Sequence, residues 1–369
     1  MGATPILPSS WTVILLPPPK RFCSSKAIGF CAGWVLGTAR TSAGKSAACW
    51  WPAGEPTLLS LPPHKELSVV AADGKCAAGS WSKSKSGRRG AVAWRAQGGS
   101  LIGRDLHDPR FETSWATGVG GDLIVGVGTH KGKLGKAPPA SGLVWRSSGK
   151  LIQINADRDV CLSATDGTRI AGTIDGRATL WPSFESSPID LAPDRTPASE
   201  VRAIDADTQI GYGFDRHGAR ALVWRGSPDS VVDLTPKGFQ EARAFAGTCG
   251  FQVGFIRPRA TTKDGIAASE DRAVIWNSSA EHWVDLNALL PAPFNASIAW
   301  AIRIDGDVIE VCGEALQVRL KHTGTSDTPP ELKEPLAILW RGRLAPSPKP
   351  ATKADITTPR RQRATKGAA

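Results

Sequence analysis

No apolar run in this 369-residue sequence approaches the roughly 18 residues that a membrane-spanning helix needs. The stretch Val13–Leu16 is apolar, but three consecutive prolines stop it and no basic region precedes it, so a secretory signal peptide is not expected. The sequence therefore predicts no membrane span, and it favours a cytoplasmic location.

The sequence also lacks the closely spaced cysteines and histidines that are typical of metal sites. The seven cysteines are odd in number and never form Cys-x-x-Cys, and no two of the six histidines have His-x-x-x-His spacing. We interpret the cysteines as small buried apolar residues in a reducing compartment and the histidines as solvated, and we predict no metal or other cofactor. The cysteines are Cys23, Cys31, Cys49, Cys76, Cys161, Cys249 and Cys312.

Long helical periodicity is scarce. Few windows keep the spacing of an amphipathic helix for more than two turns, whereas 39 glycines and 28 prolines separate short apolar runs. Short strands joined by turns account for this pattern better than helices do. The sequence therefore predicts an all-β fold.

One pattern recurs along the chain: an apolar run that ends in tryptophan, a polar loop, and a second run that ends in Asp-Leu. It is clearest at Ala219–Trp224, which is followed by Asp233–Pro236. Repeats of this length predict a propeller or a solenoid. The seven copies end at Trp51, Trp94, Trp145, Trp181, Trp224, Trp276 and Trp340.

The repeat predicts its own fold. The copy over residues 199–236 divides into four strands, and four strands in roughly 45 residues are the unit of a propeller blade. We therefore predict a seven-bladed β-propeller of four-stranded blades over residues 1–345. The expected blades are 25–62, 66–107, 113–155, 158–192, 199–236, 241–288 and 296–341 plus 11–17.

The last blade lacks a fourth strand after Trp340, whereas Thr12–Pro17 has the character of a fourth strand. We predict that this N-terminal strand pairs with the last blade and closes the ring, which leaves no end blade exposed. Beyond residue 345 the chain is rich in Pro, Lys and Arg, so residues 346–369 are expected to form a disordered basic tail.

The repeat tryptophans have a structural interpretation. Third strands are covered on both faces by neighbouring blades, and a large ring fills the gap between diverging sheets. Glycines in the second strands are expected to let another chain segment approach closely. These glycines are Gly37, Gly79, Gly126, Gly172 and Gly254.

Several repeat pieces carry a resemblance. Leu180-Trp181, Asp190-Leu191, Asp233-Leu234, Gln252-Val253-Gly254 and Leu339-Trp340 are similar to the motifs of the HAF-type extracellular repeat proteins of bacteria. That family repeats an alanine-containing run ending in Leu-Trp, then Asp-Leu-Gly, then Val-Val-Gly, and the likeness extends over residues 26–341. The resemblance implies a propeller-like repeat domain without a defined activity, often in secreted proteins.

Catalytic motifs are weak. Gly44-Lys45-Ser46 resembles the end of a phosphate-binding loop, but a strand is expected after it instead of a helix. Ser269–Trp276 resembles one degenerate Asp-box of sialidase-type propellers, yet the only tyrosine is Tyr212. The alternative that stays open is a carbohydrate-active enzyme, a glycoside hydrolase or lyase, with acids from first-strand ends lining the central channel. Asp190, Asp233 and Asp285 are repeat positions on outer strands and do not supply that pair.

Positive charge is the most suggestive functional feature. Of the formal charge of +11, the residues beyond 341 hold seven basic side chains against one acidic, so the body keeps +5. In a propeller the loops between second and third strands emerge on one face, which we call the loop-bearing face. Nine basic residues in three of these loops form the predicted basic rim: Lys83, Lys85, Arg88, Arg89, Lys131, Lys133, Lys136, Arg257 and Arg259.

Blades two and three are neighbours, so seven of these charges are expected to share one side of the rim. Concentrated positive charge attracts polyanions and acidic proteins in a salt-dependent way. We predict a monomeric, non-enzymatic binding or scaffold module that holds a protein, nucleic acid or acidic polysaccharide on the loop-bearing face or in the central channel.

Overall fold

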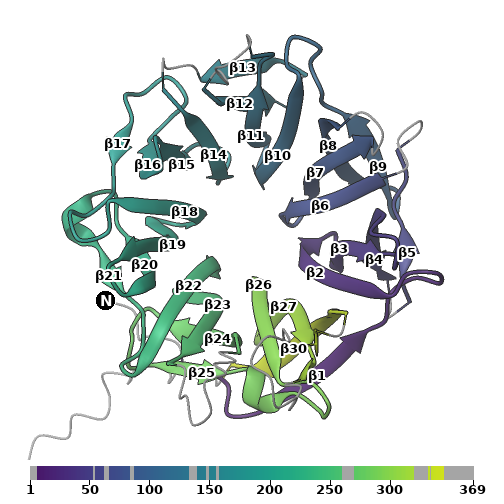
Figure 1. The fold of residues 1–369 in the computed structure, drawn as a ribbon, viewed down its shortest axis with the longest axis vertical. Coiled ribbons are helices and arrows are strands. Elements are labelled where there is room, and N and C mark those ends of the chain that lie inside the picture. Colours follow the sequence, from purple (N-terminus) through teal and green to yellow (C-terminus); the bar gives the residue numbers. More distant parts are fainter. Residues whose placement is uncertain are drawn as a thin grey trace, which may run out of the picture.

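The computed structural model describes residues 6–52, 55–61, 66–83, 87–132, 139–146, 149–154, 158–259, 270–319, 331–332 and 334–344. Seven four-stranded antiparallel sheets stand around a common axis and form a seven-bladed β-propeller (Figure 1). The predicted fold class is confirmed. The tail predicted over residues 346–369 lies outside the described residues. No helix in the described part of the chain is long and apolar enough to cross a membrane.

The blades follow one another in chain order, and each contributes its first strand to the centre of the ring (Figure 1). The strands of blades one to three are β2 (Ser24–Cys31), β3 (Trp34–Arg40), β4 (Ser46–Trp51), β5 (Thr57–Leu58), β6 (Glu66–Ala72), β7 (Cys76–Lys83), β8 (Arg88–Gln97), β9 (Ser100–Asp105), β10 (Thr113–Gly120), β11 (Leu123–Thr129), β12 (Ser141–Arg146) and β13 (Leu151–Ile154).

Blades four to six have the same order, with short outer strands. Their strands are β14 (Val160–Thr165), β15 (Ile170–Ile174), β16 (Arg177–Trp181), β17 (Ile189–Asp190), β18 (Ala198–Asp205), β19 (Thr208–Asp215), β20 (Gly218–Trp224), β21 (Val232–Asp233), β22 (Phe239–Thr248), β23 (Phe251–Pro258), β24 (Arg272–Asn277) and β25 (Trp283–Asp285). There are also two single-turn 3-10 helices: η2 (Pro228–Ser230) precedes β21, and η3 (Asn287–Leu289) follows β25.

Blade seven joins the two ends of the domain. It contains β26 (Ala296–Asp305), β27 (Val308–Leu316) and β30 (Leu336–Arg343), and its outer strand is β1 (Trp11–Leu16). Six consecutive residues of β1 pair antiparallel with β30, from Trp11 opposite Gly342 to Leu16 opposite Ala337. The predicted closure is therefore confirmed. The connection from β27 to β30 also carries a short pair of strands, β28 (Val318–Arg319) and β29 (Glu331–Leu332), which the sequence did not predict.

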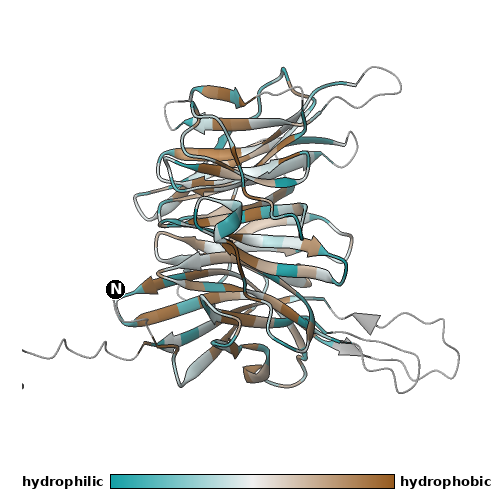
Figure 2. Ribbon diagram, turned by 90° about the vertical axis from the view of Figure 1, so that its left-hand side faces the viewer, coloured by the Kyte–Doolittle hydropathy of each residue, from teal (hydrophilic) through white to brown (hydrophobic). Residues whose placement is uncertain are grey.

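The repeated motif is explained by packing. All seven repeat tryptophans are at most 3% exposed, and apolar segments follow the strands through the stack of blades (Figure 2). In blade five the Leu234 amide donates to the Ala221 carbonyl at 2.8 Å, so the buried leucine extends the outer strand pair. The Asp233 carboxylate accepts the Thr235 amide at 2.9 Å and holds the turn. The Asp-Leu motif therefore ends the outer strand and begins the turn that follows it.

Buried serines, which no sequence motif marks, connect neighbouring blades. The Ala273 amide of blade six donates to the Ser297 hydroxyl of blade seven at 3.1 Å, and that hydroxyl donates to Asn287 at 2.6 Å. Three other serines accept an amide of the preceding blade at 3.0–3.1 Å. The four serines, each at most 3% exposed, are Ser25, Ser114, Ser199 and Ser297.

Replacing Ser297 with alanine is expected to lower the free energy of unfolding by about 1–3 kcal/mol, because the buried Ala273 amide loses its acceptor. Urea unfolding followed by tryptophan fluorescence measures the change. Ser187→Ala is the control, because Ser187 is exposed on the outer side of blade four. Equal stability of the two variants would contradict a connecting role for the serine.

The cysteines are all free, and four of them are buried: Cys31, Cys49, Cys76 and Cys312. Burial raises the pKa of the Cys31 thiol to about 12 and that of Cys76 to about 11, so these thiols stay protonated at neutral pH. The interpretation of all seven as buried residues is wrong for Cys23 and Cys249, which are exposed because one precedes β2 and the other forms the turn between β22 and β23.

Candidate functional site

Every innermost strand carries a β-bulge at the same place. In each pair of first and second strands the register slips by one residue, which leaves one residue of the inner strand without a partner. A bulge of this kind redirects a side chain. The seven residues, which we call the bulge ring, are Ile28, Val70, Thr117, Ser163, Arg202, Phe245 and Trp300.

The second-strand glycines make these bulges possible. A Cβ atom added to Gly254 would lie 1.8 Å from the Arg243 carbonyl oxygen, just before the bulge at Phe245. The predicted close approach is therefore made by the first strand of the same blade. The equivalent glycines of the other blades, each within 2.2 Å of a first-strand carbonyl, are Gly37, Gly79, Gly126, Gly172, Gly211 and Gly313.

The positions beside the bulge ring are nearly uniform across the blades, whereas the ring itself is not. The residue before each bulge is apolar and at most 3% exposed, and the residue after it is always glycine or alanine. The ring holds seven different residue types at seven equivalent positions. Equivalent packing positions carry similar side chains because they fill similar space. The diversity of the bulge ring therefore indicates that its side chains are not needed for packing between the blades. They are instead suited to contacts in the space that they face.

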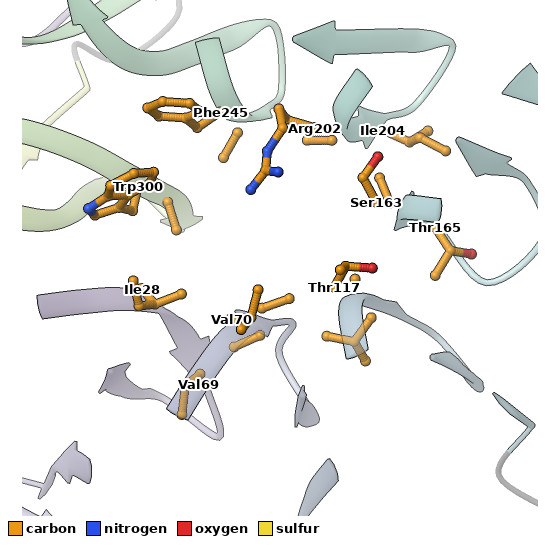
Figure 3. Close-up of a pocket in the computed structure, with 18 of the residues that line it drawn as sticks. Ile28, Val69, Val70, Thr117, Ser163, Thr165, Arg202, Ile204, Phe245 and Trp300 are labelled. Atoms are coloured by element: carbon orange, nitrogen blue, oxygen red, sulfur yellow. The ribbon is translucent and has the colours of Figure 1, made fainter. Parts of the chain in front are cut away.

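That space is the centre of the propeller. All seven blades line a cavity of about 380 Å³ there, and the bulge ring faces its open middle (Figure 3). In order around the ring, blades six, seven, one and two contribute an apolar arc, and blades three, four and five a polar arc. The apolar arc is Phe245, Trp300, Ile28 and Val70; the polar arc is Thr117, Ser163 and Arg202.

Arg202 supplies the only formal charge of the bulge ring, and its guanidinium points towards the middle of the cavity (Figure 3). Its Nη1 donates to Glu200 at 2.8 Å, while its buried Nε has no hydrogen-bond partner. The Tyr212 hydroxyl donates to the other Glu200 oxygen at 2.6 Å. Burial, with Glu200 beside it, raises the pKa of Tyr212 to about 12, so this tyrosine remains a donor.

The aromatic side of the ring is held in place. Phe245 and Trp300 stack with ring centres 4.6 Å apart and planes 24° from parallel. The Trp300 indole donates to Glu314 at 3.2 Å, and the Lys26 ammonium lies 2.9 Å from the same carboxylate. Glu314 is almost fully buried, so Lys26 neutralises it and the pair fixes the indole.

The predicted basic rim is located at the expected end of the strands. Lys83, Arg88, Arg89 and Lys131 lie where second strands end and third strands begin. In the ladder of β7 and β8, Lys83 is directly opposite Arg88 and Ser82 is opposite Arg89. The rim residues Lys85, Lys133 and Lys136 lie outside the described residues.

Arg89 connects the rim with the channel. Its guanidinium is 5.9 Å from the centre of the Trp115 ring. Trp115 in turn lines a second channel cavity of about 390 Å³, with Glu200, Tyr212 and Phe214. The positive charge of blade two thus extends to the mouth of the channel.

The blade-six members of the rim are arranged differently. Arg257 forms ion pairs with Glu241 at 2.9 Å and with Asp271 at 2.8 Å, so its charge is compensated. Arg259 lines a separate cavity over blades five and six, with His217 and Arg220. The structure therefore divides the six described rim residues into two groups.

The two channel cavities do not contain the acid pair of the enzyme alternative among their described lining residues. Among the described residues that line the two channel cavities, Glu200 is the only carboxylate. Asp190, Asp233 and Asp285 lie on the outer strands β17, β21 and β25. No three His, Cys, Asp or Glu side chains in the described ranges are grouped to hold a metal ion.

No protein-family model matches the sequence, so the HAF-type resemblance stays a prediction. No curated protein matches it either. Among solved structures, the chain is similar to an acylaminoacyl peptidase from Pyrococcus horikoshii, with a TM-score of 0.50 and 11% identity over 88% of this chain and 53% of that one.

Two further solved structures match. TolB from Acinetobacter baumannii has a TM-score of 0.45 and 11% identity, over 72% of this chain and 64% of TolB. A GH74 xyloglucanase from Xanthomonas campestris has a TM-score of 0.47 and 11% identity, over 88% of this chain and 55% of the enzyme. The chain thus spans between half and two thirds of the length of these three proteins, and at these identities the likeness shows the fold alone.

Proposed function

We propose that this protein is a non-enzymatic binding module that holds a polyanionic ligand on the loop-bearing face, above blades two and three. The observation that carries the proposal is the position of Lys83 directly opposite Arg88 in the β7–β8 ladder. Two cations at opposed positions concentrate positive charge at this point of the loop-bearing face, and concentrated positive charge attracts a polyanion.

Neighbouring residues extend the proposed site. Arg89 is one residue beyond Arg88 and reaches Trp115 at the channel mouth, and Lys131 follows β11 in the adjacent blade. A linear ligand that crosses blades two and three would therefore meet cations on both. An aromatic ring beside a guanidinium also offers a flat surface to sugars or bases.

Charge reversal at three rim residues tests this function. The variant carrying Lys83→Glu, Arg88→Glu and Arg89→Glu is expected to lose most of its retention on immobilised heparin. The slope of log affinity against log salt concentration should fall by about 2–3, because each cation that contacts the polymer releases roughly one counterion.

The control reverses three basic residues at the opposite ends of the same two blades: Lys75→Glu, Arg95→Glu and Lys150→Glu. Its net charge equals that of the test variant, so non-specific attraction falls equally in both. Equal loss of retention by the two variants, or full retention by the test variant, would overturn the proposal.

A further inference from the structure

We propose that the bulge ring is a binding site for a small amphiphilic organic anion: one carboxylate carried on a flat or compact apolar body. The carboxylate would lie against Arg202, and the apolar body against the arc formed by Phe245, Trp300, Ile28 and Val70. This site is in the centre of the propeller and is separate from the polyanion surface on the loop-bearing face.

The chemistry of Arg202 supports an acidic ligand group. A guanidinium has five N–H donors, and Glu200 takes only Nη1. Glu200 also accepts the Tyr212 hydroxyl, so its negative charge is shared between two donors. The guanidinium of Arg202 points towards the cavity (Figure 3), and its buried Nε has no hydrogen-bond partner. Guanidinium–carboxylate hydrogen bonds in a partly dry site are among the strongest polar contacts that a ligand can make.

The hydroxyls of the polar arc do not compete for that role. Thr117 donates to the Leu162 carbonyl, and Ser163 donates to the Val201 carbonyl of the next blade. Their protons are therefore used between blades, and what they offer to the cavity is oxygen lone pairs. Within the bulge ring, Arg202 is thus the side chain that donates to an anion.

The apolar arc fixes the shape of the ligand body. Phe245 and Trp300 hold each other by stacking, and Glu314 anchors the indole, so these rings present a preformed surface. Ile28 and Val70 continue it with aliphatic groups. A cavity of about 380 Å³ lined by the first strands of all seven blades suits a small molecule and not a polymer.

Titration of the full-length protein with three probes tests the site. Naphthoate has both the anion and the apolar body, naphthamide lacks only the charge, and acetate lacks only the body. By isothermal calorimetry, naphthoate is expected to bind roughly tenfold or more tightly than either of the others, because each lacks one of the two contacts.

Two substitutions with opposite expected signs make the test specific. Arg202→Met should weaken naphthoate roughly tenfold and leave naphthamide unchanged, because only the charge contact is lost. Glu200→Gln should strengthen naphthoate, because a competing carboxylate is removed. Phe245→Ala should weaken naphthoate and naphthamide alike. Arg177→Met is the matched control, since Arg177 pairs with Asp190 on the outer side of blade four at 2.8 Å.

Three outcomes would overturn the proposal. The native protein does not bind naphthoate, or the Arg202→Met variant binds it as tightly as the native protein does. The third is that Arg202→Met and Glu200→Gln lose naphthoate affinity alike, in proportion to their loss of stability. The rim variant with reversed charge at Lys83, Arg88 and Arg89 should bind naphthoate as the native protein does. The two proposals therefore succeed or fail separately.

Discussion

A chain that begins at Pro17 is expected to lose the closed ring. Trp11, Val13, Ile14 and Leu16 pack against the cores of blades seven, six and one. Fully burying a large apolar side chain contributes about 1.5–3 kcal/mol. Leu16 is buried and the other three are half-buried, so the four contribute roughly 4–8 kcal/mol before the entropy of ordering β1 is subtracted. That is comparable with the roughly 5–15 kcal/mol by which domains are stable.

The truncated protein is expected to be aggregated in size-exclusion chromatography, because the edge of β30 then has no partner. A synthetic peptide of residues 6–18, added in excess, should restore the monomer and its urea midpoint by pairing with β30 in place of β1. A peptide with Val13→Asp and Leu16→Asp is the control and should not. A truncated protein that unfolds at the native urea concentration would show that the strand pairing contributes nothing to stability.

The fold could be predicted from the sequence because the signal is repeated. A short apolar run such as Ala219–Trp224 is ambiguous alone, but seven copies with the same ending leave few architectures open. Closure could be predicted for a similar reason: a count of strands left blade seven one short, and Val13–Leu16 was the apolar run without a blade.

The bulge ring could not be predicted from strand alternation. A bulge shifts the register by one residue, so the side chain that it redirects appears in the sequence as one more strand residue. Arg202 lies among ordinary strand residues for this reason. The signal that would have found it is Gly211, whose strand partner Val201 immediately precedes the bulge. The same rule locates the other six members from their glycines.

The basic rim could be predicted only in part. Topology places all the loops between second and third strands on one face, so clusters in the sequence become clusters on that face. Compensation of a rim charge could not be predicted in this way. Arg257 pairs with Glu241 and Asp271, which are 16 and 14 residues away in the sequence. Such pairs depend on the register of two ladders, which composition does not reveal.

Replacing Gly254 with alanine is expected to destabilise the protein by roughly 3 kcal/mol or more, a large effect for one methyl group. The new Cβ would meet the Arg243 carbonyl oxygen at 1.8 Å and its carbon at 2.9 Å. Both partners are backbone atoms, so no side-chain rotation relieves the contact. The first strand of blade six must move away, and Phe245 at the bulge must move with it.

Gly74→Ala is the matched control, because the turn between β6 and β7 leaves nothing within 4 Å of an added Cβ. That change is expected to alter stability by no more than about 0.5 kcal/mol. Urea unfolding measures both variants, and the folded fraction of Gly254→Ala should also bind naphthoate more weakly, because the displaced Phe245 no longer stacks on Trp300. If Gly254→Ala were as stable as Gly74→Ala, the bulge would not depend on the glycine, and the rule that locates the ring from second-strand glycines would lose its physical basis.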